Sequence, residues 1–225
     1  MLSERDSAAL IVNGSRRHVR LLRRYRCDEL IKGIDPLISD LAQKRQLSEE
    51  RLLDAQAALD AVLAADGDLD DAVRNLFDSA KQHDRSAPTA PVLPDLFPSG
   101  GFSSVIDLPR ADEPDAVDAL AKKLELLGTG HDLAPHSAKL REAAQTVREA
   151  LNAHRDAIRT QKGAEAEEDI AKSALRRKYE ANYLDARKQW GRVLADRLFP
   201  NLYPSKRSGS DAAKVLRGEF AEKTA

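Results

Sequence analysis

The stretch "LREAAQTVREALNAHRDAI", Leu140 to Ile158, decides the fold. Its core positions alternate between spacings of four and three residues: Leu140, Ala144, Val147, Leu151, His154 and Ile158. Side chains at these spacings share one side of an α-helix, as in the seam of a coiled coil. We therefore predict a long helix that packs against another helix. His154 is interpreted as a polar seam residue that fixes register.

The regular spacing ends in "RTQKGAEAEED", residues 159–169, and a second apolar stripe runs from Ile170 to Leu194. Gly163 lies in the break. One interpretation is a turn at Gly163, which would give a long antiparallel helical hairpin at the C-terminal end. The alternative is a single long helix that bends there. The hairpin is the favoured interpretation, because glycine commonly ends helices.

Composition extends the helical prediction to the whole chain of 225 residues. Apolar residues make up 42% of the sequence and aromatic residues only 4%. Alanine and straight-chain residues, which favour helices, dominate over the branched and aromatic residues that favour strands. The prediction is an all-α fold of helical bundles, with a coiled-coil-like hairpin at its C-terminal end.

In the N-terminal half we expect a helix over residues 3–32, with Gly14 as a point of interruption, and further helices after it. The segment "RLLDAQAALDAVLAADG" places Leu52, Leu59, Val62 and Leu63 on one face and is expected to end at Gly67. A shorter helix then follows over residues 68–82.

Residues 84–110 change in character, because they contain five prolines and a double glycine. Proline removes a backbone donor and restricts the residue before it, so no long helix is expected there. The apolar residues in this segment favour a strap laid over a helical surface, between two helical subdomains. The expected domains are residues 1–83, the strap 84–110, a helical hairpin bundle 111–203, and a flexible tail 204–225.

The segment "RRHVRLLRRYRC", residues 16–27, holds six arginines and no acid. On a helix, Arg16, Arg17, Arg20, Arg23 and Arg24 fall within an arc of about 120° at 100° per residue. One hypothesis is a ridge that binds phosphate or nucleic acid. The favoured alternative is a solvated or internally paired face, because residues 48–85 have a net charge of −6 and aromatic stacking partners are scarce. A face for a protein partner is the third possibility.

Motifs for catalysis or metal binding are missing from the sequence. It contains no phosphate-binding glycine loop, no dinucleotide fingerprint and no nucleophile elbow. His131 and His136 flank a proline and are interpreted as solvated, and Cys27 as inert beside two acids. The acid pairs Asp70–Asp71 and Glu167–Glu168 are interpreted as charges at helix starts or in a turn. No catalytic residue, cofactor or metal is expected.

Two apolar groups are candidates for partner binding. Tyr183 and Trp190 share a helical stripe with Tyr179, which is expected to pack on the strap or, alternatively, to form a groove for a partner peptide. Val215, Leu216 and Phe220 lie in a short C-terminal helix that needs a surface on which to fold. That surface is either the protein's own bundle or another protein.

The sequence thus predicts a non-catalytic scaffold or adaptor protein that binds other proteins or self-associates through helical faces. The alternative is a nucleic-acid or phosphate-binding protein that uses Arg16–Arg24. No apolar run approaches the ~20 residues of a membrane-spanning helix, and the N-terminus lacks the pattern of a signal peptide. With one cysteine and a net charge of −1, a cytoplasmic location is expected.

Overall fold

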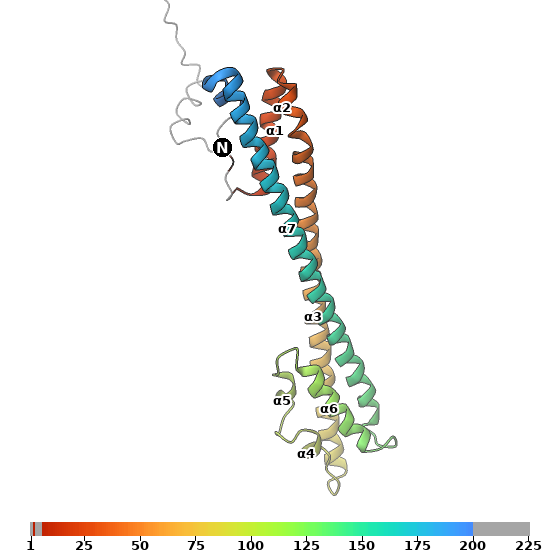
Figure 1. The fold of residues 1–225 in the computed structure, drawn as a ribbon. Helices are drawn as coiled ribbons and strands as arrows, with labels where there is room; N and C mark the ends of the chain where they lie inside the picture. The colour runs from red at the N-terminus through yellow and green to blue at the C-terminus, as the bar shows by residue number, and fades with distance from the viewer. Residues whose placement is uncertain (1, 3–5, 200–225) are drawn as a thin grey trace, which may run out of the picture. The chain divides into compact units, whose positions relative to one another are not determined.

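The computed structural model describes residue 2 and residues 6–199, and this part of the chain consists of helices and loops without any strand (Figure 1). The all-α prediction is confirmed. The helices are α1 (Ala8–Arg24), α2 (Asp28–Lys32), α3 (Asp35–Ser86), α4 (Leu93–Leu96), α5 (Ser103–Ile106), α6 (Glu113–Leu126) and α7 (Ala134–Leu198).

The chain forms two compact units. Unit 1 combines Met1–Glu49 with Gly163–Ala225, and unit 2 is Glu50–Lys162. Both α3 and α7 contribute residues to each unit. The units therefore differ from the consecutive domains expected from the sequence, because long helices bring residues that are distant in the chain side by side.

Unit 1 is built by α1, α2, the start of α3 and the later part of α7. Ile11 and Leu22 of α1 pack with Leu41 of α3 and Leu175 of α7 in one apolar cluster. Helices α3 and α7 run antiparallel here, since Lys44 pairs with Glu167 while Gly33, just before α3, lies against Lys178.

The N-terminal helix is shorter than predicted. Helix α1 begins after Ser7, whose Oγ accepts a hydrogen bond from the backbone N–H of Leu10 at 3.3 Å, as an N-cap does. It continues through the buried Gly14 and ends at Arg24. Arg26 has a φ of 55°, in the left-handed region that ends a helix, so α1 and α2 are separate helices.

The strap lies inside unit 2, on α3 and α6. The carboxylate of Asp84 accepts hydrogen bonds from the backbone N–H groups of Val92 and Leu93, at 2.7 and 3.1 Å, and this fixes the entry into α4. Lys123 of α6 donates to the carbonyl of Asp95 at 2.9 Å. The predicted packing of Tyr179, Tyr183 and Trp190 against the strap is wrong. All three pack into the unit 1 cluster instead, where Tyr179 meets the ring of Phe199 at 5.1 Å.

The predicted hairpin turn at Gly163 is also wrong, because α7 continues through Gly163 and α3 through Gly67. A single glycine costs a helix about 1 kcal/mol relative to alanine, which a long packed helix tolerates. The chain instead reverses between α6 and α7, where Gly128 has a φ of 90°. The predicted seam begins as expected, since Leu140, Ala144 and Val147 are completely buried.

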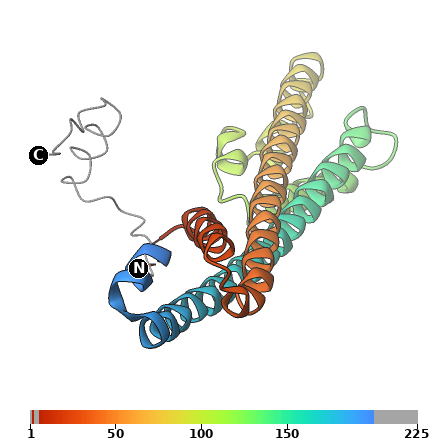
Figure 2. The same cartoon turned by 90° about the horizontal axis from the view of Figure 1, so that it is seen from above.

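Near its end α7 contains one break. Gly191 has a φ of 78° and a ψ of 170°, and the last turns of the helix change direction (Figure 2). Within the described residues, no helix is both long enough and apolar enough to cross a membrane.

Candidate functional site

Along unit 2, the side chains on one face of α3 change from exposed leucines to a half-buried phenylalanine. At 100° per residue, six side chains of this helix between Leu52 and Phe77 fall within an arc of about 60°. We call this face the α3 stripe. Its members, in chain order, are Leu52, Leu59, Leu63, Asp66, Asp70 and Phe77.

The leucines of the α3 stripe are open to solvent. Leu52, Leu59 and Leu63 are 42%, 41% and 46% exposed, and the adjacent Leu53 is 64% exposed. The sequence grouped Val62 with them, but Val62 is buried. The earlier part of α3 in unit 2 has α7 beside it, whereas α6 and the strap lie beside the later part (Figure 1). One neighbouring helix buries only one side of α3, so the leucines on the next side remain uncovered.

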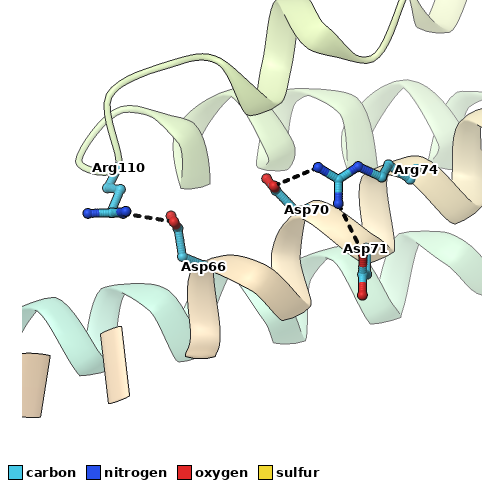
Figure 3. A network of polar contacts seen from close by, with 5 residues as sticks. All are labelled: Asp66, Asp70, Asp71, Arg74 and Arg110. Atoms are coloured by element: carbon cyan, nitrogen blue, oxygen red, sulfur yellow. Dashed lines mark hydrogen bonds and ion pairs between the residues drawn. The ribbon is translucent and has the colours of Figure 1, made fainter. Parts of the chain in front are cut away.

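Ion pairs mark the place where this covering begins (Figure 3). Arg110, in the loop before α6, donates from Nε to Asp66 Oδ2 at 2.7 Å. Arg74 binds Asp70 at 3.0 Å and Asp71 at 3.1 Å. The acid pair Asp70–Asp71 therefore lies in the middle of a helix, and the prediction of a helix start was wrong.

Glu113, the first residue of α6, is buried beside this network and only 1% exposed. Burial, followed by the charges of Asp70 and Asp66, raises its pKa from the ordinary 4.5 to about 7, against the lowering effect of Arg110. Glu113 and Asp70 share a hydrogen bond. Among the described residues, neither Glu113 Oε1 nor Asp66 Oδ1 has a hydrogen-bond partner. No local pattern predicts this cluster, because its members lie on distant segments of the chain.

Beyond the ion pairs the α3 stripe is partly covered, and Phe77 is half-buried there. The ring of Phe77 meets the edges of Phe97 and Phe102 from the strap, with centroids 5.2 and 5.3 Å apart. The guanidinium of Arg74 lies 5.9 Å from the centroid of Phe102. The same helical face thus packs against the strap at one end and is exposed at the other.

The arginine ridge lies on the outer side of α1 in unit 1. All five of its residues are exposed: Arg16, Arg17, Arg20, Arg23 and Arg24. Arg23 pairs with Asp35 at 3.1 Å. For the other four, the described part of the chain offers no ion pair. Within the described residues, internal pairing therefore accounts for one of the five arginines.

His18, on the opposite side of α1, is completely buried, and the sequence did not single it out. Its Nδ1 lies 2.7 Å from the carbonyl oxygen of Leu198, so the neutral ring donates from Nδ1. Its ring packs 3.9 Å from Phe199 and 5.0 Å from Tyr179. Burial lowers the pKa of His18 to about 4, although the hydrogen bond acts in the opposite direction. A neutral core histidine follows from this geometry.

The aromatic residues proposed for partner binding are not prominent anchors. Tyr183 and Trp190 are half-buried against the unit 1 cluster. The hydroxyl of Tyr183 donates to Asp196 at 2.9 Å. The other candidates, Val215, Leu216 and Phe220, lie outside the residues that the structure describes.

The remaining candidates for chemistry are not brought together. Cys27 is buried, and burial together with the charge of Asp28 raises the pKa of its thiol. His131 Nδ1 accepts a hydrogen bond from the Leu133 N–H at 3.2 Å. Three or more side chains arranged to hold a metal ion are not found within residues 6–199.

Comparison with known proteins gives no relative: no protein-family model, curated protein or solved structure matches this chain.

Proposed function

We propose that this protein is a non-catalytic scaffold or adaptor that binds other proteins through helical faces. The observation that carries the proposal is the row of uncovered leucines on the α3 stripe. Isolated exposed leucines are normal, whereas several exposed leucines along one side of a helix are typical of an interaction site.

The energetics favour a partner on this face. Complete burial of a leucine contributes about 2 kcal/mol, and Leu52, Leu53, Leu59 and Leu63 each keep between 41% and 64% of their surface in water. A partner helix that removes this surface from water would therefore stabilise the complex. At the other end of the stripe, Phe77 is already stabilised by its packing against Phe97 and Phe102 of the strap.

The most perturbed ionisable groups support a non-catalytic function. His18 and Glu113 are at most 1% exposed. A substrate in solution therefore does not reach the two side chains whose pKa values are shifted to about 4 and about 7.

Site-specific photo-cross-linking in the native cell tests the proposal. A photoreactive amino acid is placed at Leu59 or Leu63, and in the control at Leu126, a single leucine of α6 that is 87% exposed. We expect adducts of discrete mass from positions 59 and 63 but not from position 126. Equal adduct patterns at all three positions, or none, would refute the proposal.

The arginine ridge supports a second candidate function, which is the binding of a polyanion. Arg16, Arg17, Arg20 and Arg24 are exposed and have no ion pair within the described residues. Such arginines are free to bind phosphates and release counterions.

Duplex binding as a function of salt tests this second function. It predicts an affinity that falls steeply with salt and is lost in the double variant Arg20→Glu/Arg24→Glu. If the wild-type chain does not bind the duplex at any salt concentration from low to physiological, this function is ruled out.

A further inference from the structure

We infer that the occupant of the uncovered leucines is a basic amphipathic helix of another protein. This inference rests on the proposed function and specifies its partner. Three features of the α3 stripe carry it: its length, its charge and the unsuitability of a second copy.

The open part of the stripe has the length of a short helix. From Leu52 to Leu63 it spans twelve residues, and the eleven steps between them cover about 16 Å at 1.5 Å per residue. It ends at Asp66, where Arg110 is bound. An occupant of about three turns, with apolar residues three and four apart, matches this row of leucines.

The α3 segment that carries the leucines is rich in acidic residues. Residues 49–71 contain eight acidic side chains and one basic side chain, and five of the acids are paired with arginines: Glu49, Asp54, Asp66, Asp70 and Asp71. Asp60, beside Leu59 on α3, is exposed and has no ion pair among the described residues. Basic side chains that flank the occupant's apolar row would pair with such carboxylates.

The net charge of unit 2 as a whole also favours a basic partner. Unit 2 carries 20 acidic and 13 basic side chains, a net charge of −7, whereas the rest of the chain carries 17 acidic and 23 basic side chains, a net charge of +6. The net charge of −1 hides this asymmetry. A cationic partner is therefore attracted to unit 2 from a distance of about 10 Å at 0.1 M salt.

The same charge disfavours a second copy of this chain on the leucines. A two-fold pairing of the stripe with itself would bring two of these acid-rich segments together, each with the exposed Asp60 beside its leucines. Like charges across a helical interface are destabilising. Self-association, which the sequence left open, is thus not expected through this face.

Two synthetic peptides of 21 residues test the inference by fluorescence anisotropy with the full chain. Both carry leucines at alternating spacings of three and four. The flanking positions hold lysine and arginine in one peptide and glutamate in the other. We expect the basic peptide to bind at least tenfold more tightly than the acidic one, with an affinity that falls as salt rises.

Matched variants assign the site. Leu59→Ser/Leu63→Ser is expected to weaken the basic peptide tenfold or more, and Asp60→Lys severalfold, with a smaller salt dependence. Leu126→Ser is the control and leaves binding unchanged. All of these positions are exposed, and circular dichroism verifies that each variant keeps its helices.

Each other outcome overturns the inference. Failure of the basic peptide to bind, equal binding of both peptides, or unchanged binding by Leu59→Ser/Leu63→Ser would do so. A wild-type dimer in sedimentation that Leu59→Ser/Leu63→Ser dissociates would assign the face to a second copy. Cross-linking separates the two proposals: discrete adducts at Leu59 to a partner segment without basic residues keep the function and refute the inference.

Discussion

Units 1 and 2 differ in the type of ionisable side chain whose pKa burial shifts furthest among the described residues. Unit 1 buries His18, whose pKa is lowered to about 4, and unit 2 buries Glu113, whose pKa is raised to about 7. In both, burial is the largest cause, because the charged form loses its solvation by water and the neighbouring groups do not replace it. The two units should therefore respond to pH in opposite directions.

The units also differ in how completely they cover their long helices. In unit 1, α1 packs with α3 and α7 in one cluster. In unit 2, the strap and α6 cover the α3 stripe only from Asp66 onward. Whether a side chain on this face of α3 is covered thus depends on where the strap and α6 begin to contact the helix.

The largest expected effect compares two leucines of α3. Leu76 is completely buried, so Leu76→Ala should lower the free energy of unfolding by about 2–5 kcal/mol. Leu63→Ala, at a side chain 46% exposed, should lower it by less than about 1 kcal/mol. Urea unfolding of the two variants measures both values. Similar losses would mean that Leu63 is a core residue in solution.

The second effect is acid sensitivity in unit 1. The unfolded chain binds a proton at His18 near pH 6.5, while the folded chain resists protonation down to about pH 4. The stability that neutral His18 provides is therefore present above pH 6.5 and falls by about 2–3 kcal/mol as the pH drops through this window. Hydrogen exchange of unit 1 amides measures the loss. His18→Gln is less stable at pH 7 but should lack this pH dependence, and an equally steep loss in His18→Gln would contradict the assignment.

The third and smallest effect is the opposite response in unit 2. Folded Glu113 keeps its proton up to about pH 7, whereas the unfolded chain releases it near pH 4.5. Stability is then fully present below pH 4.5 and falls by about 1–2 kcal/mol as the pH rises through 7. Glu113→Gln, which keeps a neutral side chain, should raise the stability of unit 2 at pH 8 and leave it nearly unchanged at pH 4.5. No gain at pH 8 in the exchange of unit 2 amides would show that Glu113 is ionised without penalty.

Helical content and the start of the seam were predictable from local pattern. The spacing of Leu140, Ala144 and Val147 predicted a buried seam, and the scarcity of branched residues predicted an all-α fold; both predictions are confirmed. Gly67 and Gly163 misled the prediction, because a local penalty of about 1 kcal/mol does not stop a helix that neighbouring chain supports.

The candidate site depends on distant segments, so the sequence showed its residues but not their exposure. Leu59 and Phe77 lie on the same face of α3, and the strap packs against Phe77 but leaves Leu59 exposed. Glu113 acquires its environment from Asp66 and Asp70, which belong to another helix. Neither arrangement leaves a local signal.

Thiol labelling of the α3 stripe tests the central claim most directly. In a Cys27→Ser background, Leu59→Cys and Phe77→Cys place one thiol on the open part and one on the covered part of the same face. We predict that position 59 is modified much faster than position 77, and that saturating basic peptide protects position 59 while leaving the slow rate at 77 unchanged. Equal rates at the two positions in the free protein, or no protection at position 59, would contradict the claim that this face is open at its leucines and binds a helix there.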